Sequence, residues 1–69
     1  MDKNLPPIAK NMKKYRDKLD ISQSKLSRIA EVTLHTITKI ESGATPDPRI
    51  KTLRKIAGAL GTKIDDLLK

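Results

Sequence analysis

A run of twenty residues near the middle of the chain constrains its fold more than any other feature. Between Gln23 and Ser42, apolar residues recur three or four positions apart in two short stretches separated by a turn. That spacing places the apolar side chains on one face of each stretch and predicts two short helices, the first bracing the second at a steep angle. The residues expected to face inward are Leu26, Ile29 and Ala30 on the first helix and Ile37 and Ile40 on the second.

Residues with capping chemistry bound both of these helices. Ser22 can cap a helix over residues 23–30, and Thr33 can cap a helix over about residues 34–42, because their hydroxyls accept from free N–H groups of the first turn. Gly43 follows the second helix at the position where a glycine ends many helices. The sequence therefore predicts where the pair of helices begins, at Ser22, and where it ends, at Gly43.

Three further helices complete the expected fold. A first helix starts at Pro7 or Ile8, and a fourth covers about residues 49–60 after a rigid loop that contains two prolines. A short fifth helix covers about residues 63–68. The apolar stripes are Ile8, Met12, Tyr15 and Leu19 on the first helix and Leu53, Ile56, Ala57 and Leu60 on the fourth. With no strand pattern, the predicted fold class is all-α.

The length and composition allow one small domain with an aliphatic core. The chain has 69 residues, one Tyr and no Phe, Trp or Cys. We expect residues 1–69 to form a single domain, with residues 1–7 as a flexible arm. The absence of Cys excludes disulfides and thiol catalysis, and a single His with scattered carboxylates indicates no metal or other cofactor. Without a nucleophile–base pair or a Gly-rich phosphate loop, we expect no enzyme.

The charge balance favours an anionic partner. The net charge is +7, which suits nucleic acid first, although a soluble domain with surplus surface lysines would look the same. No apolar run approaches the ~20 residues of a membrane span, and the first residues lack the apolar stretch of a signal peptide. We therefore expect a cytoplasmic protein that makes no contact with a membrane.

The outer face of the helix at 34–42 is the candidate binding surface. At about 100° per residue, His35, Thr38, Lys39 and Ser42 fan out opposite the apolar side. Such a helix on a small basic protein can enter the major groove of DNA. His35 could meet a base edge or a phosphate, or simply be solvated, and Lys39 could reach guanine or a phosphate. Leu34 either completes the core or contacts a thymine methyl, and both readings stay open.

The order of these features resembles the Cro and phage-repressor type of helix-turn-helix domain, the lambda-repressor-like fold. The resemblance extends from about Ile8 to Leu68. It rests on Arg16, Ile21-Ser22-Gln23, Leu26, Ile37, Ile40-Glu41-Ser42-Gly43, Pro48, residues 52–61 and residues 64–68. It implies a compact five-helix domain with a central helix-turn-helix at residues 23–42. It also implies double-stranded DNA as the partner and a repressor that acts as a homodimer, through its C-terminal helices, on a near-palindromic operator.

The resemblance also implies roles for single residues. The expected DNA-binding residues are Gln23, Ser24, Thr33, Leu34, His35, Thr36, Thr38, Lys39, Ser42 and Arg49. In the family, a Gln at position 23 anchors the DNA backbone, although it could merely fill the first position of its helix. An Arg at position 49 reaches toward the minor groove in some members, although it could equally be a solvated side chain. Arg16 and Glu41 are expected to form a structural ion pair between the first helix and the end of the recognition helix.

Three residues depart from the family pattern. Ser27 stands where the family has Ala in the close contact between the two central helices, and Glu31 and Asp20 each stand where Gly is common. Glu31 would bear roughly 1 kcal/mol of strain if the turn keeps a left-handed backbone. None of the three changes removes the outer face of the recognition helix.

A second class of function stays open. The same fold occurs in antitoxins and in subunits that dock on larger enzymes, so the main partner could be another protein. A partner that co-purifies at fixed stoichiometry would favour this alternative. No feature of the sequence indicates a small-molecule ligand.

Overall fold

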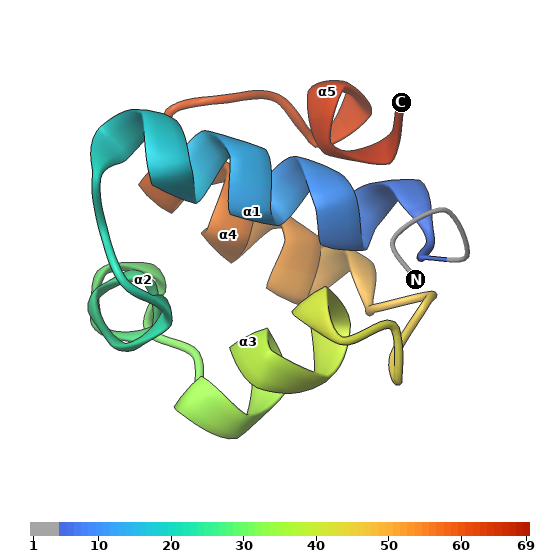
Figure 1. Ribbon diagram of the computed structural model, residues 1–69, viewed down its shortest axis with the longest axis horizontal. Helices are drawn as coiled ribbons and strands as arrows, with labels where there is room; N and C mark the ends of the chain where they lie inside the picture. Colours follow the sequence, from blue (N-terminus) through green and yellow to red (C-terminus); the bar gives the residue numbers. More distant parts are fainter. Residues whose placement is uncertain (1–4) are drawn as a thin grey trace.

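Five α-helices account for most of residues 5–69, the part of the chain that the computed structural model describes (Figure 1). They are α1 (Pro7–Leu19), α2 (Gln23–Ala30), α3 (Leu34–Glu41), α4 (Ile50–Leu60) and α5 (Ile64–Leu68). Residues 5–69 contain no strand, so the all-α prediction is confirmed. In Figure 1, α4 lies behind α1, with α5 on one side of this pair and α2 and α3 on the other. No helix of the described residues is long and apolar enough to cross a membrane.

Local capping chemistry sets the helix ends as the sequence predicts. The Ser22 hydroxyl accepts a hydrogen bond from the Lys25 backbone N–H at 3.0 Å at the start of α2. The Thr33 hydroxyl accepts from the Thr36 backbone N–H at 3.1 Å at the start of α3. These bonds satisfy N–H groups that have no partner within the helix. At the end of α3, Ser42 caps the helix and Gly43 follows with a φ of 87°.

Two acidic residues hold left-handed backbone conformations on either side of α2. Asp20 has a φ of 57° and Glu31 a φ of 59°, and each is the C-cap of the helix before it. Each backbone N–H bonds a carbonyl of the last turn, which ends the helix. For a residue with a Cβ this conformation costs roughly 1 kcal/mol, so the strain expected at Glu31 is present.

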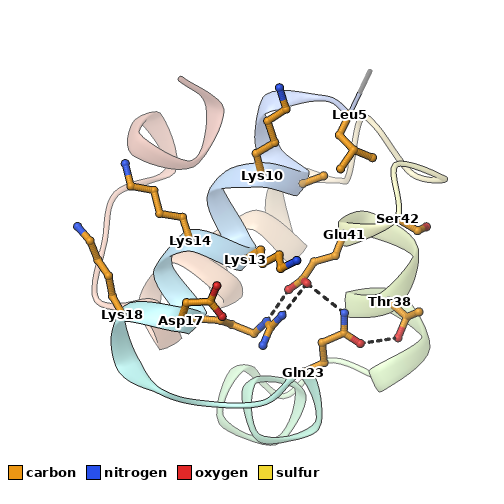
Figure 2. A pocket seen from close by; sticks show the side chains of 12 residues that line it. Leu5, Lys10, Lys13, Lys14, Asp17, Lys18, Gln23, Thr38, Glu41 and Ser42 are labelled. Carbon is orange, nitrogen blue, oxygen red and sulfur yellow. Dashed lines mark hydrogen bonds and ion pairs between the residues drawn. The ribbon is translucent and has the colours of Figure 1, made fainter. Parts of the chain in front are cut away.

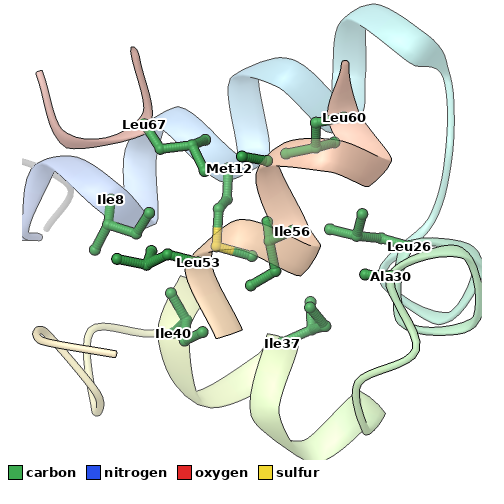
Figure 3. Close-up of a cluster of buried hydrophobic side chains, with 11 residues drawn as sticks. Ile8, Met12, Leu26, Ala30, Ile37, Ile40, Leu53, Ile56, Leu60 and Leu67 are labelled. Carbon is green, nitrogen blue, oxygen red and sulfur yellow. The ribbon is translucent and has the colours of Figure 1, made fainter. Parts of the chain in front are cut away.

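The core is aliphatic, as the composition requires. Figure 3 shows the buried side chains of all five helices converging between α1, α3 and α4. The cluster comprises Ile8, Met12, Leu26, Ala30, Ile37, Ile40, Leu53, Ile56, Ala57, Leu60 and Leu67. The apolar stripes predicted for α3 and α4 are all buried, so these two predictions are confirmed.

Two predicted inward positions are wrong. Leu19 is 50% exposed and Ile29 is 48% exposed. Leu19 is the last residue of α1, beyond the cover of the buried cluster. On α2 the buried residues are Leu26, Ser27 and Ala30. At 100° per residue, the middle of this buried face lies about 110° around the helix axis from Ile29. An eight-residue helix has only two turns, so its apolar spacing does not distinguish the two possible faces.

The N-terminal segment differs from the expected arm of residues 1–7. Pro7 is the first residue of α1 and Pro6 is its N-cap. A Cβ added at Gly43 would lie 3.0 Å from Leu5 Cδ2, so Leu5 packs against the end of α3. Residues 1–4 of the expected arm lie outside the described residues. The glycine at position 43 thus serves a close approach as well as the left-handed turn.

Candidate nucleic-acid interface

The helix-turn-helix packs α2 against α3 and leaves one side of α3 open. Ile37 and Ile40 are fully buried, whereas His35, Thr38 and Lys39 are exposed. The small Ser27 is 8% exposed and permits close packing of α2 in the core. Its hydroxyl donates to the Ser24 carbonyl at 2.7 Å, which satisfies the one polar group that the close packing buries.

The start of α3 is exposed and rich in hydroxyls. Leu34 is 46% exposed, so it does not complete the core, and its methyls are available to a ligand. The Thr33 and Thr36 hydroxyls lie 2.8 Å apart and share a hydrogen bond. Thr36 is only partly exposed, which leaves Thr33 and Leu34 as the more accessible residues of this end.

An ion pair joins α1 to the end of α3. Arg16 Nε donates to Glu41 Oε2 at 2.7 Å, and Arg16 Nη2 donates to Glu41 Oε1 at 2.9 Å. A third bond runs from Arg16 Nη1 to the Ile21 carbonyl at 2.9 Å. The Glu41 side chain is 6% exposed, so this two-point pair is largely shielded from water. The hydrogen bond to Glu41 raises the pKa of Arg16, which keeps the guanidinium charged.

Gln23 extends this pair toward the outer face of α3. Its amide Nε2 donates to Glu41 Oε1 at 3.0 Å, while its Oε1 lies 3.3 Å from the Thr38 hydroxyl (Figure 2). The Glu41 carboxylate can only accept hydrogen bonds, so the atom of the Gln23 amide that faces it is the nitrogen, and the amide oxygen faces Thr38. One N–H of that amide remains uncommitted at the start of α2. The sequence did not predict the bond between Gln23 and Glu41.

The Thr38 hydroxyl has one proton and two possible acceptors. It lies 2.9 Å from the Leu34 carbonyl and 3.3 Å from Gln23 Oε1, so it can donate to only one of them at a time. In either case its oxygen keeps a lone pair for an outside donor, such as a base amino group. Ser42 is more committed locally, because its hydroxyl donates to the Lys39 carbonyl and accepts from the Ala44 N–H.

The remaining predicted residues lie at the margins of this surface. Ser24 is exposed in the first turn of α2, beside Gln23. Arg49 is exposed as the N-cap of α4, after the loop that contains the two prolines, and its side chain makes no capping bond. The structure brings Gln23, Thr38 and Glu41 together and leaves Arg49 apart from that network. Within residues 5–69 no group of three His, Asp or Glu side chains could hold a metal ion.

A set of lysines on α1 is not among the DNA-binding residues predicted from the sequence. Lys10, Lys13, Lys14 and Lys18 line an open groove together with Gln23 and Thr38. The sequence indicates a solvated helix face, with a contact of Lys10 or Lys14 to a phosphate as the alternative. The available signal was their spacing of three and four positions, which places them along one side of the helix.

A family model described as helix-turn-helix matches residues 12–67, which is most of the chain and includes α2, α3 and α4. No curated protein and no solved structure matches this chain significantly. The matched range contains the packed pair α2–α3 and both members of the Arg16–Glu41 ion pair. The chain therefore belongs to the Cro/C1-type helix-turn-helix family of DNA-binding transcription regulators.

Proposed function

We propose that this protein binds double-stranded DNA sequence-specifically, with α3 in the major groove. The observation that carries the proposal is the division of α3 into two sides. Ile37 and Ile40 hold one side in the core, while His35, Thr38 and Lys39 are exposed on the other. A helix held in this way presents its polar side chains to base edges without losing its own packing.

Residues around α3 supply the contacts that position the protein on DNA. The first turn of α2 offers backbone N–H groups and the free N–H of the Gln23 amide, both suited to a phosphate. Ser24 and Thr33 add hydroxyls at the two helix starts. Arg49 is placed after the loop, where a long cation can reach a narrow minor groove. Thr36 and Ser42 hold local hydrogen bonds and are expected to contribute less.

The proposed mode of action is repression by a homodimer on a near-palindromic operator. One domain of this size contacts only a few base pairs, and two half-sites about one helical turn apart roughly double the binding energy. Leu68 on α5 is 48% exposed and is the candidate for the contact between the two copies. A Leu68→Glu variant should keep its helical circular-dichroism spectrum and lose dimers in sedimentation, whereas unchanged dimers would place the contact elsewhere.

Selection of bound sequences from a random DNA pool tests the proposal directly. His35→Ala and Lys39→Ala should keep the melting temperature, because neither side chain is in the core. Each should cost about 1–3 kcal/mol of binding to the selected operator and relax the preferred base at one symmetric pair of positions. Lys55→Ala, an exposed lysine of α4, is the matched control. If both α3 variants bind as tightly and as selectively as the parent, α3 is not the reading element.

A further inference from the structure

An open groove of about 1140 Å³ runs between α1 and the helix-turn-helix (Figure 2). One wall is formed by α1, with Lys10, Lys13 and Lys14. The other wall is formed by the start of α2 and the side of α3, with Gln23, Thr38 and Ser42. The Arg16–Glu41 pair lies between the two walls and ties them together. The groove is therefore continuous with the surface that is proposed to contact DNA.

The groove is strongly positive. Five basic and two acidic side chains line it, a surplus of three positive charges. Of the two carboxylates, Glu41 is already bonded by Arg16 and Gln23. No ion pair within residues 5–69 engages Lys10 or Lys13. The lysine charges are thus available to an external anion, and Asp17 is the one remaining carboxylate of the lining.

The two walls carry donors of different kinds. Figure 2 shows Lys13 extending toward Glu41, while Lys10 extends from the rim of the groove beside Leu5. Across the groove lies an amide N–H of Gln23 that its bond to Glu41 leaves free, while the Thr38 hydroxyl donates its proton within the protein. A chain of phosphates separated by sugars presents anionic oxygens on both sides, which suits ammonium groups on one wall and the neutral Gln23 amide donor on the other.

We propose that the phosphodiester backbone of one strand of the bound duplex lies in this groove, with Lys10 and Lys13 contacting its phosphates. The inference rests on the proposed function, because Gln23 and Thr38 belong both to the groove and to the surface around α3. It adds α1 to the interface as a second source of phosphate contacts. These contacts carry no base preference and raise the affinity for every duplex alike.

A charge-matched pair of variants tests this assignment. Lys10→Gln/Lys13→Gln removes two charges from the groove, and Lys55→Gln/Lys63→Gln removes two exposed charges outside it. Affinity is measured over a range of salt for the selected operator and for an unrelated duplex. Each lost phosphate contact should lower the magnitude of the log K versus log[salt] slope by about 0.9 and, at 0.1 M salt, weaken binding about eightfold. The groove variant should show this on both duplexes, and the control should not.

A scan with single uncharged methylphosphonates locates the contact on the DNA. The parent should lose affinity when particular phosphates are neutralised, and the Lys10→Gln/Lys13→Gln variant should be insensitive at those same phosphates. Equal behaviour of the groove and control variants would overturn the assignment, as would a changed base preference in the groove variant. Thermal melts of both variants should match the parent, because all four lysines are exposed.

The outcomes separate this inference from the proposed function. If the parent selects no DNA, both proposals fail. If His35→Ala relaxes the base preference while the groove variant behaves like its control, sequence-specific binding stands and only the groove assignment fails. If the groove variant weakens all duplexes and His35→Ala changes the preferred base, both are supported.

Discussion

Replacing Arg16 with Ala should remove the main polar connection between α1 and α3. The change deletes two hydrogen bonds to Glu41, at 2.7 and 2.9 Å, and one to the Ile21 carbonyl. The Glu41 side chain is 6% exposed, so water cannot fully replace the guanidinium. Loss of one partner costs about 1–3 kcal/mol for an unsatisfied polar group and about 3–5 kcal/mol for a buried ion pair. Because Gln23 still bonds Glu41, we expect an intermediate loss of about 2–4 kcal/mol.

This loss should not depend on pH near neutrality. The bond to Glu41 raises the pKa of Arg16 in the folded protein. Because this pKa is raised, the stabilisation from the Arg16–Glu41 pair is fully present at any pH below the pKa that Arg16 has in the unfolded chain. It is lost only as the pH rises through the folded-state pKa, far above the neutral range.

Urea unfolding followed by circular dichroism measures the effect. In a domain of this size, 2–4 kcal/mol corresponds to a melting-temperature decrease of roughly 10–30 °C. Lys14→Ala, an exposed basic residue of the same helix, should change stability by less than about 0.5 kcal/mol. The double variant with Glu41→Ala should lose less than the sum of the single losses. Strict additivity, or a loss for Arg16→Ala no larger than for Lys14→Ala, would refute this reasoning.

Three further changes test local features of the fold. Glu31→Gly should raise stability by about 0.5–1 kcal/mol in urea unfolding, because it relieves the left-handed backbone at φ 59°, whereas Glu31→Ala should not. Ile37→Val should cost about 0.5–1.5 kcal/mol in the same assay, since it removes a methyl from a fully buried site. Lys69 and Thr62 lower the pKa of Asp66, so its stabilisation of α5 is present above the unfolded-state pKa and is lost as the pH falls through the folded-state value. NMR chemical shifts of the α5 amides, followed as the pH is lowered, should report a lowered pKa for the Asp66 carboxyl. Shifts that follow an ordinary or raised carboxyl pKa would contradict this prediction.

Local chemistry made the helix limits predictable. Ser22 and Thr33 are good capping residues in any context, and Gly43 tolerates a left-handed backbone that most residues avoid. Each of these signals depends on a few neighbouring residues, so the helix ends can be predicted without knowing the fold. The burial of Ile29 was predicted wrongly because the direction of a two-turn helix depends on what packs against it.

The candidate site was predictable only in its helical part. The exposure of His35 and Lys39 follows from the position of Ile37 and from helix geometry alone. The bond between Gln23 and Glu41 joins residues eighteen positions apart and depends on how three helices meet. The α1 groove depends on the same arrangement. Sequence periodicity describes one helix at a time, so it cannot place side chains across a tertiary contact.

The single aromatic residue gives this protein a built-in optical label. Tyr15 is the only Tyr, and the chain has no Trp or Phe, so tyrosine emission comes from one site. The ring is half-buried against the core cluster, and Lys18 Nζ lies 5.6 Å from its centroid. Unfolding removes that shielded environment, and the emission then reports the packing of α1 specifically. Coincidence of this signal with the helical signal would show that α1 leaves the core in the same cooperative step as the other helices.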